Sequence, residues 1–438
     1  MTAPLPPTGD LAAAVARLDA LTNWESRPRN MMRVGIEPMG DLMRRLGEPQ
    51  KAFRAVHVGG TKGKGSVSAL IEAALVRAGL RVGRYASPHV ERVNERVTID
   101  GRDIDDATLA RALSKALDAY AAARGEDTAA RDATWFDLLT AAAFLIFRDA
   151  GAQWAVVEVG LGGRLDSTNI VHGEVAVVTN VELEHTEVLG KTRAAIAREK
   201  AGIAKPGATL VTSLASADEA GAVVRAVAAE RGASVAWVAV DGGDTIEAAN
   251  VALAGEVLNR LGARGATARS GETLGARHLD AEARSAARLV GRMERMDARV
   301  GAKSGVKSVP VVLDGAHVPF NIAHVLRDLA RTPELAGPCV AVVALAADKD
   351  APGFMRELQG RAAALVCTDV PSSNRGRSAQ DLQAIATSLG LEAEIEPDPV
   401  LALRRGLALA AERNAWLLVT GSLYLVGRLR SEVQPAGR

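Results

Sequence analysis

The sequence predicts an α/β protein of more than one domain, on three observations. Apolar, β-rich segments alternate with segments of helical periodicity, which indicates βαβ units and a mostly parallel sheet. Apolar residues make up 48% of the 438 residues but aromatic residues only 3%, so Ala, Val and Leu must fill the core. A single core rarely grows beyond about 300 residues, so this length requires a second domain.

The order of the elements predicts where the two domains lie. We expect a P-loop-type, mostly parallel sheet domain over residues 1–288 and a smaller Rossmann-like α/β domain over residues 289–438. A nearly all-round apolar helix over 137–148 is interpreted as plain core. The strands expected in the first domain are 53–58, 154–159, 175–181 and 209–214, and those in the second are 309–313, 339–345, 364–370 and 416–420.

Composition excludes several classes of partner. Lys and Arg total 53 against 52 Asp and Glu, and this balance offers no global field for nucleic acid or an anionic membrane. Cys339 and Cys367 lie in apolar runs, which predicts buried free thiols and a reducing compartment. Residues 1–7 lack a basic segment followed by an apolar one, and no apolar run of about 18 residues occurs. We therefore expect a cytoplasmic protein, and a monomer.

A glycine-rich segment follows the first strand. Glycines allow main-chain N–H groups to face phosphate oxygens, Lys64 supplies a positive charge, and the Ser66 hydroxyl is suited to a magnesium ion. The spacing departs from the common phosphate-loop pattern, because Val58 replaces the first Gly and Gly65 separates Lys64 from Ser66. A tight strand-to-helix connection is the alternative. We expect the phosphates of ATP to be bound by Gly60, Thr61, Lys62, Gly63, Lys64, Gly65 and Ser66.

Two polar residues follow at the ends of neighbouring strands. Glu158 lies in an otherwise apolar strand, where a carboxylate is costly to bury unless it meets a cation. It is either a metal ligand or the partner of a nearby arginine such as Arg164. His185 comes just beyond the next strand, at the same edge of the sheet, where a metal ligand and a structural histidine are equally plausible.

Two further groups of polar residues can be interpreted as ordinary structural features. Lys200 lies in the run REKAG, which from the residues alone indicates a solvated helix face. In the second domain, Asp314 and His317 follow a strand and would face a ligand crevice. An Asx-turn made by Asp314 is the other interpretation.

Eight motifs in order extend from residue 57 to residue 427. They are HVGGTKGKGS, YASPH, VVEVGLGGRLDSTN, VTNVELEHTEVLG, IAREKAGIAKPG, GRME, VLDGAH and TGSLYLVG. In these motifs the chain resembles the folylpolyglutamate synthases and dihydrofolate synthases, a branch of the Mur ligase superfamily. A single glycine loop would be weak evidence, whereas eight ordered motifs across nearly the whole chain are specific.

The resemblance implies roles for individual residues. It implies a metal site with one or two Mg²⁺ ions held by Ser66, Ser87, Glu158 and His185. It implies catalytic roles for Lys64, His185 and Lys200, with Lys200 carbamylated. It implies further ATP contacts from Asn250, Arg292, Asp314 and His317. It implies a substrate pocket bordered by Ser87, Pro88 and Phe136, and it implies that Ser422 and Tyr424 receive the incoming glutamate.

The resemblance also implies a reaction. A folate or dihydropteroate carboxylate attacks the γ-phosphate of ATP, an acyl phosphate forms, and the amine of L-glutamate displaces phosphate. The rival interpretations are another Mur-type amino-acid ligase and a non-catalytic nucleotide-binding regulator. Three positions depart from the usual family pattern: Lys62 replaces Asn, Glu184 replaces Asp, and Val318 replaces Asn. The sequence does not decide between dihydropteroate and folates as substrate.

Overall fold

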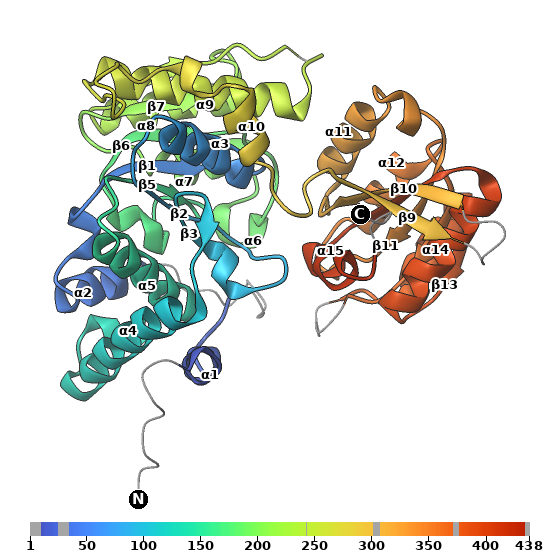
Figure 1. The fold of residues 1–438 in the computed structure, drawn as a ribbon, viewed down its shortest axis with the longest axis horizontal. Helices are drawn as coiled ribbons and strands as arrows, with labels where there is room; N and C mark the ends of the chain where they lie inside the picture. The colour runs from blue at the N-terminus through green and yellow to red at the C-terminus, as the bar shows by residue number, and fades with distance from the viewer. Residues whose placement is uncertain (1–9, 25–34, 242, 301–306, 371–375, 434–438) are drawn as a thin grey trace, which may run out of the picture. The chain divides into compact units, whose positions relative to one another are not determined.

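The computed structural model describes residues 10–24, 35–241, 243–300, 307–370 and 376–433. The chain divides into two compact units, Met1–Arg288 and Leu289–Arg438, each with its own sheet and covering helices (Figure 1). The predicted fold class is confirmed. Residues 1–7, on which the expectation of a chain without a targeting segment depends, lie outside the described residues.

Eight strands of the described part of the first unit form one sheet in the order β4-β3-β2-β5-β1-β6-β7-β8. The pairs from β2 through β5, β1, β6 and β7 to β8 are parallel, and β3 and β4 add an antiparallel edge. The bounds are β1 Arg54–Gly59, β2 Val82–Tyr85, β3 Val97–Ile99, β4 Arg102–Asp103, β5 Trp154–Glu158, β6 Gly173–Val178, β7 Thr209–Thr212 and β8 Ser234–Trp237.

Helices cover both faces of this sheet (Figure 1), which is why β5 is buried along its whole length and β1 and β6 are buried along most of theirs. Helices α3 and α9 pack together on one face, and α5 packs on the other with α4 and α2. Every residue of α5 from Asp137 to Phe147 is buried, which confirms its interpretation as core. The bounds are α1 Leu11–Asp19, α2 Glu37–Arg45, α3 Lys64–Arg77, α4 Asp106–Glu126, α5 Trp135–Asp149, α6 Thr186–Leu189, α7 Arg193–Ala201, α8 Glu219–Glu230, α9 Ile246–Ala263 and α10 Ala281–Ala286.

The second unit has a smaller sheet in the order β13-β12-β11-β14-β10-β9. All its pairs are parallel except β9 with β10. Cys339 and Cys367 are buried free thiols, as predicted, and burial raises the pKa of each to about 12. The bounds are β9 Glu294–Val300, β10 Lys307–Asp314, β11 Cys339–Val343, β12 Ala362–Cys367, β13 Ala393–Ile395, β14 Trp416–Thr420, α11 Pro319–Leu329, α12 Ala351–Leu358, α13 Ala379–Ser388, α14 Pro399–Arg413 and α15 Leu423–Arg430.

The strand order brings distant motifs to one edge of the first sheet. Strand β1 lies between β5 and β6, and Val58 pairs with Glu158 and with Val177. Because parallel strands share their carboxyl edge, the glycine-rich segment, Glu158 and the segment leading to His185 leave the sheet side by side. Among the helices of the described segments, none combines the length and the apolar character needed to cross a membrane.

Candidate active site

The glycine-rich segment turns sharply from β1 into α3. Gly60 has a φ of +138°, and a Cβ there would lie 1.9 Å from the Thr179 hydroxyl oxygen. Gly63 has a φ of +83°, and a Cβ there would lie 2.8 Å from Asn250 Oδ1. Only glycine fits both positions. The turn therefore brings the N-terminus of α3, whose first N–H groups have no acceptor within the helix, to the edge of the sheet.

This turn is bonded to the segment that follows β6. The Thr61 N–H donates to the Asn180 carbonyl at 3.0 Å, and the Lys62 N–H donates to Asn180 Oδ1 at 2.9 Å. The Lys62 carbonyl accepts from the Thr179 hydroxyl at 2.6 Å and from the Asn180 amide at 3.1 Å. Thr179 and Asn180 were not predicted as site residues. Their polar side chains at a strand's carboxyl end were the signal that could have identified them.

His185 immediately precedes the short helix α6 and has a left-handed conformation, with a φ of +54°. Non-glycine residues in this conformation are uncommon and concentrate at functional sites. The Glu184 carboxylate lies 3.6 Å from His185 Nε2, and its Oε1 accepts from Lys62 Nζ at 3.0 Å. The His185 side chain is 18% exposed and therefore accessible at the sheet edge.

Lys200 is 5% exposed, so the interpretation of its helix face as solvated is wrong for this residue. On the same helix, Arg198 is exposed and pairs with Glu230. Lys200 Nζ donates to the carbonyl of Gly60 at 2.8 Å, which ties α7 to the phosphate-loop candidate. Burial, followed by the charge of Lys64, lowers the pKa of the Lys200 amine from 10.5 to about 7.

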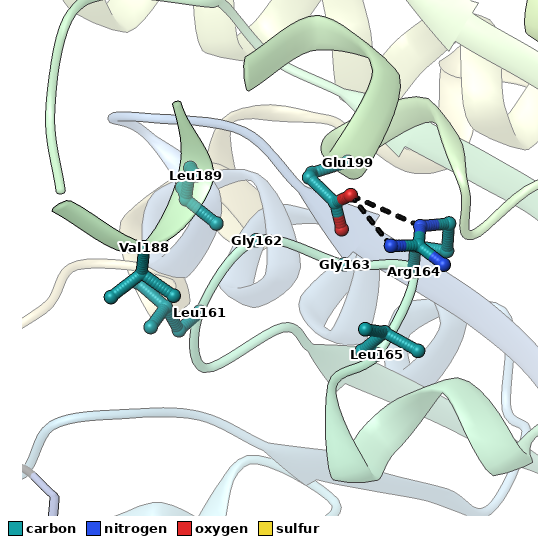
Figure 2. A pocket seen from close by; sticks show the side chains of 8 residues that line it. All are labelled: Leu161, Gly162, Gly163, Arg164, Leu165, Val188, Leu189 and Glu199. Carbon is teal, nitrogen blue, oxygen red and sulfur yellow. Dashed lines mark hydrogen bonds and ion pairs between the residues drawn. The ribbon is translucent and has the colours of Figure 1, made fainter. Parts of the chain in front are cut away.

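Glu158 ends β5 and is 3% exposed. Arg164, the partner that the sequence suggested for it, instead forms an ion pair with Glu199 at 2.9 Å. Figure 2 shows that pair at one side of a cavity of about 80 Å³, with Leu161, Val188 and Leu189 on the other side. The arginine named for Glu158 therefore has Glu199 as its ion-pair partner, and the metal-ligand interpretation of Glu158 stays a prediction.

The loop after Glu158 is held by Asp166. The Leu161 N–H donates to Asp166 Oδ2 at 2.8 Å, and the Thr168 N–H donates to Asp166 Oδ1 at 3.0 Å. Burial raises the pKa of the Asp166 carboxyl, and these donors oppose that shift. At the start of this loop, the ring of Phe136 lies 2.5 Å from where a Gly160 Cβ would be. Phe136 therefore lies directly against the backbone that follows Glu158.

The other predicted substrate residues of the first unit lie on a loop after β2. Ser87 and Pro88 follow Tyr85, whose ring centroid is 5.8 Å from that of Phe136. Ser87 is partly exposed and Pro88 is exposed. The loop with Ser87 therefore begins directly after a ring that packs against Phe136.

In the second unit, Asp314 makes the Asx-turn that was the structural alternative to a ligand contact. Its Oδ1 accepts from the Ala316 N–H and its Oδ2 from the Met293 N–H, both at 2.8 Å. His317 Nδ1 lies 2.8 Å from the Gly315 carbonyl, and Arg292 is exposed. Ser422 is 8% exposed at the start of α15, whereas Tyr424 is 45% exposed. The predicted residues of this unit thus gather around the carboxyl ends of β10 and β14.

The comparisons with known proteins agree with this arrangement. The chain matches the Mur ligase middle domain over residues 58–259 and the Mur ligase glutamate ligase domain over residues 291–423. The chain belongs to the folylpolyglutamate/dihydrofolate synthase family of Mur ligases. The resemblance inferred from the eight motifs is confirmed.

Several members of this family are similar over most of the chain. A Mycobacterium tuberculosis dihydrofolate synthase/folylpolyglutamate synthase is 29% identical, covering 97% of this chain and 95% of that protein. A probable bifunctional folylpolyglutamate synthase/dihydropteroate synthase of Halobacterium salinarum is 34% identical over 91% of this chain. The chain spans about half of that relative's length, 49%.

Solved structures of the family match the fold of the whole chain. E. coli FolC in complex with DHPP and ADP has a TM-score of 0.79 and 26% identity, covering 98% of this chain and 99% of that chain. A Yersinia pestis bifunctional folylpolyglutamate synthase/dihydrofolate synthase complexed with AMPPNP and Mn ion has a TM-score of 0.77 and 28% identity, with coverage of 98% and 99%.

Proposed function

We propose that this chain is an ATP-dependent ligase that joins L-glutamate to a folate or to dihydropteroate through an acyl phosphate. The observation that carries the proposal is the carboxyl edge of the first sheet. There the glycine turn after β1 is bonded to the segment leading to His185 and to the buried Lys200, next to the strand that ends at Glu158. Residues 1–288 would bind ATP and residues 289–438 would form the glutamate ligase domain.

The residues at this edge fit a nucleotide phosphate. Gly60 and Gly63 leave no room for a Cβ, and Gly63 begins α3 without a side-chain cap. That geometry keeps the first N–H groups of the helix available to phosphate oxygens. The proposed phosphate contacts are the residues from Gly60 to Ser66, with Asn250 beside Gly63.

The donor set also fits a magnesium ion shared with a nucleotide. In the described part of the chain, no three His, Cys, Asp or Glu side chains gather closely enough to hold a metal ion by themselves. Magnesium is commonly held by one or two carboxylates together with substrate phosphates and water. We propose Ser66, Ser87, Glu158 and His185 as the protein's ligands. The bound metal would neutralise charge on the transferred phosphoryl group.

Two lysines complete the proposed site. Lys64 lies in the first turn of α3, where its ammonium can stabilise the developing charge on the γ-phosphate. Lys200 has a pKa of about 7, so near neutral pH a large share of its amine is unprotonated and can react with carbon dioxide. We propose that the resulting carbamate faces the metal. The chain's own hydrogen bond from Lys200 to Gly60 supports this placement.

The acid substrate is proposed to lie along Phe136, Ser87 and Pro88. Its carboxylate attacks the γ-phosphorus, the bond to the β,γ-bridging oxygen breaks, and ADP leaves. The amine of L-glutamate then attacks the acyl carbon, phosphate leaves, and the amine loses a proton. We propose that Arg292, Asp314 and His317 of the second unit contact ATP. We also propose that Ser422 and Tyr424 bind the incoming glutamate. We further propose a cytoplasmic monomer that needs no nucleic-acid or membrane partner.

A panel of acceptors tests this function. Phosphate release would be followed with ATP, Mg²⁺ and L-glutamate while dihydropteroate, tetrahydrofolate or a cell-wall precursor acid is offered in turn. Glutamate-dependent turnover with either pterin acid is the expected result. Turnover with the wall precursor alone would make the chain another Mur-type ligase, and nucleotide binding without turnover would favour a regulator.

A further inference from the structure

Lys62 and Glu184 are the two departures from the family pattern that lie beside the proposed phosphate site, and they contact each other. Lys62 Nζ donates to Glu184 Oε1 at 3.0 Å although 121 residues separate them in the chain. Their side chains are 16% and 10% exposed, so the pair is only weakly screened by solvent. The Coulomb attraction between the two charges is therefore stronger than between the same charges on the open surface.

The pair lies between the two parts of the proposed site. Lys62 belongs to the glycine turn, and its backbone N–H and carbonyl are both bonded to Asn180. The same Glu184 oxygen that accepts from Lys62 lies 3.6 Å from His185 Nε2. The positive charge of Lys62, in the proposed phosphate turn, is therefore paired with the negative charge of Glu184, next to the proposed metal ligand His185.

We propose that the Lys62–Glu184 ion pair is a positioning device that balances charge between the nucleotide and the metal in this site. The proposal rests on the function proposed above. Lys62 attracts phosphate oxygens but repels the metal, and Glu184 does the reverse. With the pair intact the two effects cancel in part, and the two residues hold the phosphate turn against the His185 segment.

This role predicts opposite effects on the two ligands when one member of the pair is neutralised. Lys62→Asn, which introduces the usual family residue, removes the Lys62 charge from the Glu184 carboxylate. We expect AMPPNP in EDTA to bind about tenfold more weakly, and Mn²⁺ to bind the AMPPNP-saturated protein about tenfold more tightly. Glu184→Gln should shift both affinities about tenfold in the reverse directions.

The double variant and two controls complete the test. Lys62→Asn/Glu184→Gln should return both affinities to within about threefold of the parent, since the two opposite shifts offset each other. Lys62→Arg keeps the charge and should behave like the parent. Glu174→Gln breaks the ion pair between Arg54 and Glu174. That pair joins the amino ends of β1 and β6, at the edge of the sheet away from the proposed site. Glu174→Gln should move neither affinity.

Calorimetry in EDTA measures the nucleotide, and electron paramagnetic resonance of Mn²⁺ measures the metal. If the pair only stabilised the fold, each single variant would bind both AMPPNP and Mn²⁺ more weakly. That result would overturn the proposal. Single-variant shifts below about threefold, or a double variant whose affinities stay more than about threefold from the parent, also overturn it. A parent protein that binds neither AMPPNP nor Mn²⁺ would overturn the proposed function as well, so the two failures are distinguishable.

Discussion

Each unit contains a turn in which a strand's carboxyl end passes through glycine into a helix, and the two turns differ in what satisfies their backbone. After β1, the turn from Gly60 to Ser66 is held from outside by Asn180 and Lys200. After β10, the turn from Asp314 to His317 is held partly by its own acid. The Asp314 carboxylate accepts from the Ala316 N–H within the turn and from the Met293 N–H outside it, while the Gly315 N–H donates to the Gly291 carbonyl.

The difference concerns charge as well as geometry. The first turn carries or contacts three lysines, and a helix begins within it, so its environment attracts anions. The second turn contains a carboxylate that its own backbone already uses. Two turns of the same topology are therefore suited to different tasks: the first to binding phosphate, and the second to fixing the direction of the chain around Arg292 and His317.

The largest effect should come from the acid next to the first turn. Glu158→Gln or His185→Ala should lower turnover by about a thousandfold or more, because each removes a proposed metal ligand at the phosphoryl group. Steady-state phosphate release measures the loss, and a thermal melt checks folding. Near-normal rates in a folded variant would remove these residues from the metal site.

Adding one methyl group to each turn gives a second contrast. In Gly60→Ala the new Cβ would lie 1.9 Å from the Thr179 hydroxyl at a φ of +138°, so the turn must deform. We expect AMPPNP affinity to fall by about a hundredfold, since the N–H groups move.

The matched variant is Gly315→Ala, whose new Cβ would meet the end of the Leu423 side chain at 2.3 Å. That side chain can move, so the variant should cost only about 1–3 kcal/mol of the free energy of unfolding. Equal losses of nucleotide affinity in the two variants would contradict the contrast between the turns.

Removing the carboxylate of the second turn should affect stability in addition to the proposed contact of Asp314 with ATP. Asp314→Ala leaves the N–H groups of Met293 and Ala316 without their acceptor, at a cost of about 1–3 kcal/mol for each group that water does not reach. Asp314→Asn keeps one oxygen acceptor and should lose less. Urea unfolding measures both, and an unchanged midpoint in Asp314→Ala would show that this turn does not depend on its acid.

The state of Lys200 gives a prediction that depends on pH. Its pKa is lowered to about 7, whereas a lysine in the unfolded chain remains protonated up to about 10.5. Burial therefore penalises folding fully below pH 7, and the penalty disappears as the pH rises. Because the neutral amine is the reactive form, ¹³C-labelled bicarbonate should give a carbamate resonance at pH 8 that weakens at pH 6. The resonance should be absent in Lys200→Arg. A signal that persists in that variant would come from another group.

Most of the parallel strands at the centre of the two sheets were predicted from the sequence, but fewer of the strands at the sheet edges were. The expected strands correspond to β1, β5, β6, β7, β10, β11, β12 and β14, because buried parallel strands appear as continuous apolar runs. The expected strand 175–181 is wrong at its end, since β6 stops at Val178 and polar Thr179 and Asn180 leave the sheet to bond the glycine turn. Strand β9 was missed because its alternating, half-exposed residues do not form an apolar run.

Site residues were predictable where the functional groups lie within one motif. They were not predictable where the site depends on contacts between residues far apart in the sequence. The residues alone placed Lys200 on a solvated face, because a short charged run says nothing about the helix's neighbours. Proximity in the chain suggested Arg164 for Glu158, yet the fold pairs Arg164 with Glu199. The contact between Lys62 and Glu184 joins two motifs, and no local pattern encodes it.

The central claim is that the edge beside the first turn activates a carboxylate as an acyl phosphate. It is tested most directly with an acid substrate whose reacting carboxylate carries ¹⁸O, incubated with ATP, Mg²⁺ and L-glutamate. The account predicts that one labelled oxygen per turnover appears in the released phosphate, because the carboxylate oxygen that attacks the γ-phosphorus leaves with it. Amide formation with unlabelled phosphate would contradict the account.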